Sequence, residues 1–208
     1  MQTALLVDGG FLKQKFRFSQ NGRYPTAEEV FEFLSRDVMD CDELRKDTLF
    51  RIYFYDCRPY DGAVFDPRSR SSVDFGNSPS AMAQRKFLDE LSTKPRVALR
   101  AGELVYRGLV IPQDKLVFNE DGEVKVEADD LVYNFVQKQV DIKMGLDIAW
   151  ISQKRLVEKL VLVAGDSDLI PAMKFARRQG LLVYLAPLEH SVKAGMLVHA
   201  DDLLRVSV

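Results

Sequence analysis

The sequence predicts an α/β protein built on a mainly parallel central sheet. Short apolar runs at residues 4–7 and 160–164 stop at glycine and aspartate, which is typical of strands that are buried on both faces. Segments with helical apolar spacing lie between such runs. Because strands and helices alternate along the chain, we expect a doubly wound sheet with helices on both faces.

The N-terminal quarter of the chain alternates apolar runs with amphipathic segments. Thr26 follows Pro25 and is suited to cap a helix whose apolar residues recur at helical spacing. The run LFRIYFY is dominated by aliphatic and aromatic side chains, which favour a strand. The predicted elements are a strand over 4–7, helices over 11–17 and 26–38, and a strand over 49–55.

The middle of the chain is the least regular part. Residues 56–80 are rich in Pro, Gly, Ser, Asp and Arg, which predicts a long loop or insertion. Residues 115–126 predict a β-hairpin that turns at 119–122. A helix over 81–91 and a strand over 97–106, interrupted near Gly102, lie between these two segments.

The C-terminal part returns to alternating helices and strands. Pro171 lies in the first turn of one predicted helix and Gly180 follows its end, as is usual for these two residues. The predicted elements are a helix over 128–152 with a break near 140–141, a strand over 160–164, a helix over 168–179, a strand over 181–185, and a last helix capped by Ser191 that runs toward Asp202.

Composition and charge narrow the class of protein. The 208 residues are enough for one large domain, which we expect to span 1–208 with an insertion around 56–127. A net charge of −2 argues against a protein that coats nucleic acid through bulk positive charge. The N-terminus lacks the basic region that is typical of a signal peptide, and no apolar run is long enough to cross a bilayer. The two cysteines are expected to be reduced. These observations predict a cytoplasmic protein without membrane contact.

Aspartates follow two of the predicted central strands. Asp8 ends the first apolar run, and Asp166 and Asp168 lie just after residues 160–164. Ligands of open parallel sheets bind at the carboxyl ends of the strands, so these side chains are expected to meet at one edge. Clustered carboxylates repel one another unless a cation lies between them, and oxygen ligands suit Mg²⁺ or Mn²⁺. Each aspartate taken alone also fits an ordinary turn or helix cap.

A further acidic contribution comes from Asp141 and Asp147. Asp141 lies at a predicted helix start or break. Asp147 is six residues further on, about 120° away around a regular helix, so the two carboxylates need not face the same point. Asp147 lies in a largely apolar stretch, where a carboxylate requires either a partner or a place at the rim of a site.

These motifs, in this order, resemble the signatures of NYN domains. The match rests on Asp8-Gly9 after the first strand, on Lys138-x-Val140-Asp141 with Asp147, and on Gly165-Asp166-Ser167-Asp168 before a helix. The sequence is most similar to the LabA-like branch of the PIN-like nuclease superfamily. The resemblance covers the chain outside residues 56–127.

The resemblance implies a PIN-like, Rossmannoid three-layer sandwich and a Mg²⁺- or Mn²⁺-dependent nuclease, with single-stranded or structured RNA as the expected substrate; a homodimer stays open. It implies catalytic roles for Asp8, Asp141, Asp166 and Asp168, and metal binding by the same four residues and Asp147. Gly9, Lys138 and Ser167 are the candidates for substrate binding, although Ser167 equally suits an ordinary cap and Lys138 a solvated surface position.

One departure from the family pattern leaves other readings open. Many NYN domains have an asparagine three residues after the first aspartate, where this chain has Phe11. A non-catalytic RNA-binding or regulatory module that keeps the acidic pocket is therefore an alternative. A Toprim-type enzyme also uses an Asp-x-Asp motif, but such enzymes have a glutamate after the first strand, where this chain has Asp8.

Some basic and aromatic side chains are candidates for guiding a single-stranded nucleic acid by charge and stacking: Arg58, Arg68, Arg70 and Arg107, with Tyr55 and Tyr60.

Overall fold

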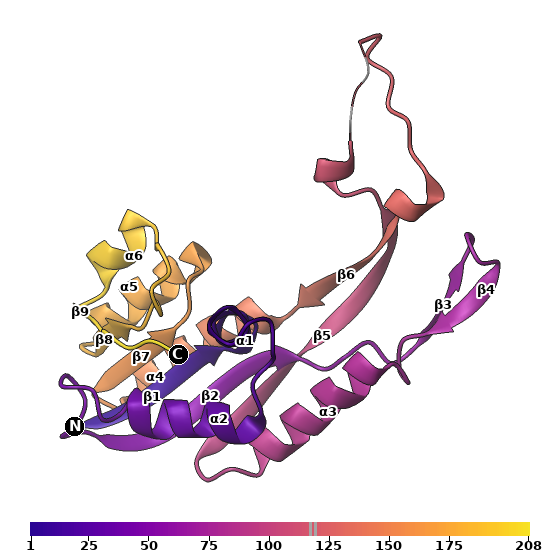
Figure 1. Cartoon of the computed structure of the whole chain (residues 1–208). Coiled ribbons are helices and arrows are strands. Elements are labelled where there is room, and N and C mark those ends of the chain that lie inside the picture. Colours follow the sequence, from indigo (N-terminus) through magenta and orange to yellow (C-terminus); the bar gives the residue numbers. More distant parts are fainter. Residues whose placement is uncertain (117, 119) are drawn as a thin grey trace.

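A seven-stranded sheet forms the centre of the molecule (Figure 1). The structure is a computed structural model that describes residues 1–116, 118 and 120–208. The strands lie in the order β6-β5-β2-β1-β7-β8-β9, and all neighbours are parallel except β6, which runs antiparallel to β5. The prediction of a mainly parallel sheet is confirmed. The strands are β1 (Gln2–Asp8), β2 (Thr48–Cys57), β5 (Val97–Val110), β6 (Val132–Lys138), β7 (Lys159–Val163), β8 (Leu182–Leu185) and β9 (Asp202–Leu203).

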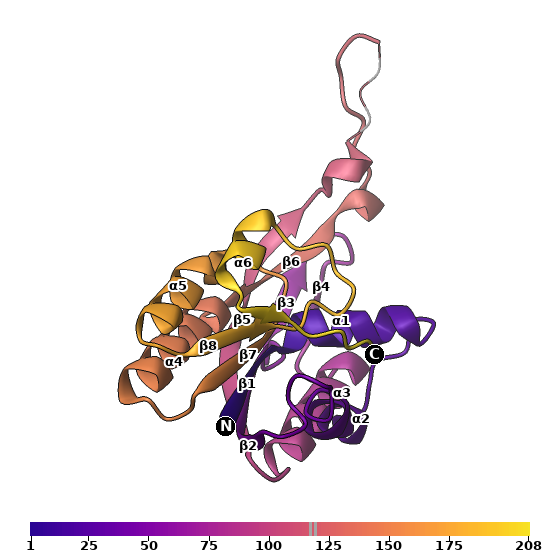
Figure 2. The same cartoon turned by 90° about the vertical axis from the view of Figure 1, so that its left-hand side faces the viewer.

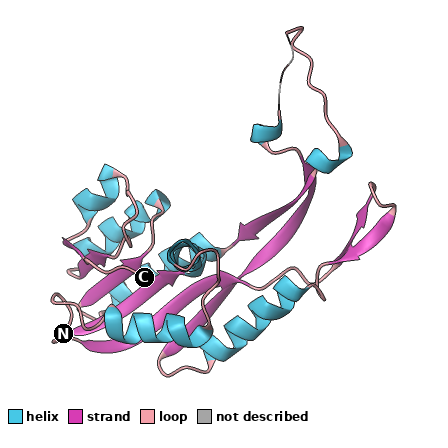
Figure 3. Cartoon of the chain, viewed as in Figure 1, coloured by secondary structure: helices cyan, strands magenta, loops and turns pink. Residues whose placement is uncertain are grey.

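Helices cover both faces of the sheet, so the predicted three-layer sandwich is confirmed (Figures 2 and 3). Leu5 and Val7 of β1 face the first helical layer, whereas Ala4 and Leu6 face the second. This alternation buries both faces of β1, and it explains why its sequence is apolar throughout. The first layer contains α1 (Gly9–Ser19), α2 (Ala27–Glu32) and α3 (Pro79–Ser92); the second contains α4 (Val140–Lys154), α5 (Ile170–Arg178) and α6 (Ala194–His199).

Local sequence signals set the helix starts. The Thr26 hydroxyl accepts a hydrogen bond from the Glu29 N–H, and the Glu29 carboxylate accepts one from the Thr26 N–H, which forms a capping box at α2. A π-helical turn over Phe33–Asp37 continues α2. The Ser78 hydroxyl accepts a hydrogen bond from the Ala81 N–H and so caps α3, with Pro79 in its first turn.

An arm made of β5 and β6 extends beyond the helical layers, with residues 111–116 and 120–131 at its tip (Figure 1). A small hairpin of β3 (Ala63–Asp66) and β4 (Ser71–Asp74) lies beside it. The Tyr133 hydroxyl donates to the Asp66 carboxylate at 2.6 Å, which fastens this hairpin to β6. Within the segment 56–127, α3 and the start of β5 belong to the sandwich itself.

Four predicted elements differ from the structure. The strand expected over 97–106 with an interruption near Gly102 continues to Val110 as β5, and its irregularity lies between Tyr106 and Leu109. Residues 132–138 form the antiparallel strand β6, not a helix, because this stretch pairs with β5. The expected loop over 56–80 contains the β3–β4 hairpin. The last helix begins at Ala194 and not at Ser191. In the hairpin expected over 115–126, Phe118 forms an antiparallel bridge with Val124, whereas residues 117 and 119 lie outside the described part.

Cys41 and Cys57 are both unpaired thiols, as expected. Among the residues that the structure describes, no helix has both the length and the apolar character needed to cross a membrane.

Candidate active site

β1 is the strand at which the strand order of the sheet reverses, so its carboxyl end lies at a topological switch point. β2 and β5 lie on one side of β1, whereas β7 and β8 lie on the other. Ligands of open α/β sheets bind at such a switch point because the loops that leave the two neighbouring strands diverge there. Asp8 is the last residue of β1, and Asp166 comes shortly after β7. The two predicted aspartates therefore flank the switch point.

Asp8 is held in place by the start of α1. Its Oδ1 atom accepts a hydrogen bond from the Phe11 N–H at 3.0 Å, so the carboxylate caps the helix. Burial raises the pKa of Asp8 above its usual range, and the nearby carboxylates of Asp141 and Asp56 add to the rise, while the Phe11 N–H opposes it. The site thus disfavours the charged form of Asp8 when no cation is present.

The loop after β7 presents Asp166 and Asp168 to solvent. The Oδ1 atom of Asp166 accepts a hydrogen bond from the Asp168 N–H at 2.9 Å, which caps a short 3₁₀ turn over Ser167–Leu169. The capping role expected of a strand-end aspartate is therefore real. It occupies one oxygen of Asp166, and both side chains remain exposed to a ligand.

Asp141 links the two groups of carboxylates. It lies in the first turn of α4, next to Gln139, whose φ of 70° ends β6 and redirects the chain into the helix. Partial burial raises the pKa of Asp141, and the carboxylates of Asp166 and Asp168 raise it further. Since Asp141 also raises the pKa of Asp8, these four predicted residues share one electrostatic environment at one edge of the sheet.

The donor set fits a hard divalent cation in its chemistry. Within the described ranges, no three His, Cys, Asp or Glu side chains converge on one point at ligand distance. Mg²⁺, however, is usually held by one or two carboxylates, with water and substrate phosphates completing its octahedral shell. Asp8, Asp141 and Asp166 provide only oxygen donors, which suits Mg²⁺ or Mn²⁺.

A cavity of about 730 Å³ opens over Asp8 and Asp166. Glycines at its wall allow close approach: a Cβ atom at Gly165 would lie 2.8 Å from the His190 ring and 3.0 Å from the Phe11 ring. Gly9, expected to contact substrate, is buried instead, and a Cβ atom there would lie 2.6 Å from the Phe54 ring. Its small size allows α1 to start against β2.

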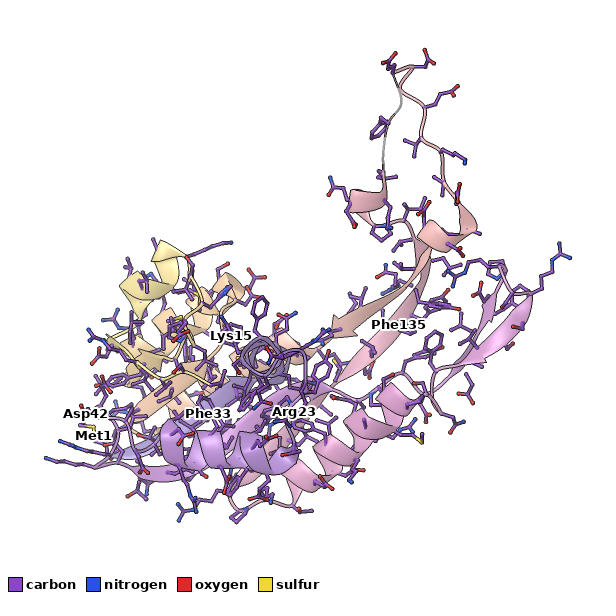
Figure 4. All side chains as sticks on the ribbon, in the orientation of Figure 1. Met1, Lys15, Arg23, Phe33, Asp42 and Phe135 are labelled. Carbon is purple, nitrogen blue, oxygen red and sulfur yellow. The ribbon has the colours of Figure 1, made fainter. Side chains whose placement is uncertain are left out.

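Phe11 and His190 form one wall of this cavity. Their rings meet edge to face with centroids 5.6 Å apart, and the Lys15 ammonium lies 5.6 Å from the Phe11 ring centroid. Figure 4 labels Lys15 on α1. His190 is a candidate functional residue that sequence reasoning missed. It lies in the loop after β8, so the rule that strand ends carry the site could have indicated it.

A buried ion pair supports the cavity from the side of β2. The Lys13 ammonium lies 2.6 Å from the carboxylate of Asp56, which is only 2% exposed. The Gln84 amide of α3 donates to the same carboxylate at 3.1 Å and accepts from Lys13 at 3.0 Å. Asp56 also escaped sequence reasoning, although it follows the apolar part of β2 just as Asp8 follows that of β1.

The other predicted residues are placed as follows. The Ser167 hydroxyl accepts a hydrogen bond from the Lys193 ammonium at 3.0 Å, so a cation already lies beside it. Lys138 is exposed at the end of β6. Asp147 accepts hydrogen bonds from Tyr55 at 2.8 Å and from Arg100 at 2.7 Å, so its carboxylate has protein partners. Tyr55 is fully buried, which excludes the expected stacking role for it.

Comparison with known proteins points to one family. Residues 113–205 match the family model of the NYN domain, which confirms the resemblance for this part of the chain, where the motifs around Asp141 and Asp166 lie; the Asp8-Gly9 motif lies outside the match, and the LabA-like branch remains a prediction. A crystal structure of a protein of unknown function from Vibrio parahaemolyticus is similar, with 15% sequence identity and a TM-score of 0.49 over 97% of this chain and 90% of that one. No curated protein sequence matches this chain.

Proposed function

We propose that the protein is a metal-dependent ribonuclease. Residues 113–205 match the model of the NYN domain, which belongs to the PIN-like superfamily, and this match suggests a nuclease-type function on RNA. The observation that carries the proposal is the electrostatic coupling of Asp141 to Asp8 on one side and to Asp166 and Asp168 on the other. Asp8 and Asp166 each cap a helix or turn locally, but carboxylates from three separate segments at one edge of the sheet also raise the cost of charging one another. A cation removes that cost.

In the proposed mechanism, Asp8, Asp141, Asp166 and Asp168 would hold Mg²⁺ or Mn²⁺, with water and substrate phosphates completing the shell. Such an ion would polarise a phosphate oxygen and lower the pKa of an attacking water. Asp8 is the most shielded of the four and is fixed by the Phe11 N–H, so it provides a rigid ligand. Asp147 stays bound to Tyr55 and Arg100 and orients α4, which carries Asp141, instead of acting as a ligand.

The chain's own cations bind and orient the RNA phosphates. Lys15 lies at the cavity wall over Phe11, and Lys193 lies beside Ser167. Each ammonium can form a charge-assisted hydrogen bond with a phosphate oxygen. Lys138, exposed at the end of β6, is the candidate for binding a phosphate further along the RNA.

We also propose that the arm and the β3–β4 hairpin are the insertion in a single domain, and that the protein acts in the cytoplasm.

The test is cleavage of labelled single-stranded RNA and DNA in Mn²⁺, Mg²⁺ or EDTA by wild type and Asp166→Asn. The variant removes a proposed ligand while its amide oxygen still accepts from the Asp168 N–H, so the fold is retained. Asp42→Asn is the matched control, because Asp42 is 86% exposed and precedes β2 at the opposite edge of the sheet. Figure 4 labels Asp42 beside Met1, at the end of the chain where β1 begins.

Cleavage by wild type and Asp42→Asn, together with its loss in EDTA and in Asp166→Asn, is the expected result. Equal cleavage by Asp166→Asn would overturn the assignment of the site. Binding of RNA and Mn²⁺ without any turnover would favour the non-catalytic module, a reading that Phe11 in the place of the family asparagine supports. Light scattering on the same sample tests the homodimer.

A further inference from the structure

A second cavity of about 630 Å³ adjoins the cavity over the aspartates. The two cavities share Lys13, Tyr24 and Gln137 as lining residues, so they lie side by side with these side chains at their common border. The second part lies between α3, the segment that follows β2, and the inner side of β6. A polymer held over Asp8 and Asp166 can therefore continue into this second part.

Aromatic rings from three separate segments line the second cavity, which we call the aromatic groove: Tyr60 after β2, Phe75 after β4, and Phe135 of β6. The Phe135 ring lies 5.3 Å from Tyr60 and 4.9 Å from Phe75, measured between centroids. All three rings are only partly buried, unlike the fully buried Tyr53 and Phe54 of the central sheet. Figure 4 labels Phe135 on the arm.

Partly open aromatic rings beside a phosphodiester-binding site are suited to stacking on nucleobases. Each base presents a flat π-face, and the stack requires no particular base identity. The lining also includes the amide of Gln137, which can hydrogen-bond to sugars and base edges.

The lining of the groove offers no negative charge that would repel a polyanion. It contains no Asp or Glu, although acidic side chains outnumber basic ones in the whole chain by 31 to 29, and its cation, Lys13, is paired with the buried carboxylate of Asp56. A strand that lies in the groove therefore meets no carboxylate from the lining residues. An apolar peptide or a second copy of this chain would gain nothing from the continuity with the cavity over the aspartates.

We propose that the aromatic groove binds a single-stranded nucleic acid by stacking its bases on Tyr60, Phe75 and Phe135, next to the phosphate held over Asp8 and Asp166. This proposal rests on the proposed nuclease function, because that function is the reason for placing the next phosphate of the nucleic acid over the aspartates. It assigns a substrate-positioning role to the β5–β6 arm and to the segment around the β3–β4 hairpin.

The test measures binding without turnover. Fluorescent single-stranded RNA and DNA of about 12 nucleotides, a length within the range of single-strand sites, are titrated in EDTA with the Asp166→Asn protein. Phe135→Leu keeps an apolar side chain but removes the ring, and Phe135→Trp restores a ring. Phe65→Leu is the matched control, because Phe65 is 61% exposed on β3 and does not line the groove. Each protein is also titrated with an abasic strand of the same length.

Phe135→Leu is expected to weaken binding of the normal strand by about 5- to 100-fold, the effect of losing one stacked base. Phe135→Trp and Phe65→Leu are expected to bind as tightly as the Asp166→Asn parent, and the difference between Phe135→Leu and the parent is expected to vanish on the abasic strand. The RNA and DNA arms show which sugar is preferred. Equal binding by Phe135→Leu and Phe65→Leu would overturn the proposal, as would an equal loss on the abasic strand.

Photocrosslinking of 5-iodouridine RNA to the wild-type protein makes the test independent of how any variant folds. Crosslinks to Tyr60, Phe75 or Phe135 are expected, and crosslinks confined to other residues would contradict the proposal. Concentration-dependent self-association that Phe135→Leu abolishes would assign the groove to a second copy instead. RNA binding in the groove by a wild-type protein that does not cleave RNA would disprove the nuclease function alone. Cleavage by wild type, together with RNA binding that Phe135→Leu does not weaken, would disprove the groove proposal alone.

Discussion

The ring of Phe11 meets the imidazole of His190 edge to face, with centroids 5.6 Å apart, at the wall of the cavity that contains Asp8 and Asp166. The two residues are far apart in sequence, since Phe11 lies in the first turn of α1 and His190 lies in the loop after β8. Phe11 stands where many NYN domains have an asparagine, so the wall that would otherwise carry an amide carries an aromatic ring and an imidazole. We expect His190 to supply the polar contact that Phe11 cannot.

Replacing His190 by alanine tests that expectation. Because an imidazole that donates to a phosphate oxygen forms one hydrogen bond to a charged group, we expect kcat/KM for RNA to fall about 10-fold. The melting temperature should change little, since His190 is exposed. His199→Ala is the matched control, because His199 lies at the end of α6 and does not line the cavity. Equal losses in both variants would show that His190 has no specific role.

Asp141→Asn separates the electrostatic role of the acidic cluster from its role in folding. Removing this charge relieves the repulsion that raises the pKa of Asp8, so the metal-free variant should melt no lower than wild type. Added Mn²⁺ should raise the melting temperature of wild type and much less that of the variant, because binding to the folded state stabilises it. We expect cleavage to fall by about 100-fold or more. A metal-free variant that melts well below wild type would indicate a structural role for Asp141.

The buried pair of Lys13 and Asp56 is expected to be essential for stability. Lys13→Met leaves the Asp56 carboxylate, 2% exposed, without its cation, and we expect a loss of about 3–5 kcal/mol in the free energy of unfolding. The double variant Lys13→Met/Asp56→Leu removes both charges and should recover much of that loss. Urea denaturation of wild type, both single variants and the double variant gives the coupling energy. Additive losses would show that the two side chains do not act as a pair.

The elements that could be predicted from sequence are those whose local pattern and tertiary environment agree. β1 and β7 are apolar throughout because both of their faces are covered, and the same pattern located Asp8 and Asp166 at their carboxyl ends. The start of α2 follows from Thr26, which caps it through a local hydrogen bond. The helix predicted over 81–91 is α3, although its cap, Ser78, was assigned to the loop before it. These signals involve only neighbouring residues, so no distant partner is needed to read them.

The errors arise where a distant partner decides the structure. Residues 132–138 were predicted to be helical, yet they pair with β5 from Glu103 to Val110, and no local signal reveals that partner. Asp56 and His190 were missed for the same reason. The aspartate is identified by its contact with Lys13 of α1, and the histidine by its contact with Phe11. Asp147 lies near the site in sequence, but Arg100 and Tyr55 determine its role.

The capping box of α2 should make a measurable, pH-dependent contribution to stability. The Arg23 guanidinium and the Thr26 N–H hold the pKa of Glu29 at about 2, below its ordinary value of 4.5. Since the pKa is lower in the folded state, the contribution is fully present above about pH 5 and is lost as the pH falls from 4.5 through 2. Both side chains are partly exposed to solvent, which limits the effect to about 1 kcal/mol or less.

Glu29→Gln tests this contribution because the amide oxygen can still accept from the Thr26 N–H but carries no charge. The free energies of unfolding of wild type and variant should differ by a constant amount between pH 5 and 7 and should converge as the pH approaches 2. Glu32→Gln is the control, since Glu32 is on the same helix but lies 3.7 Å from its partner, Arg36, in an exposed pair. A difference that persists unchanged at pH 2 would show that Glu29 acts through packing or hydrogen bonding and not through its charge.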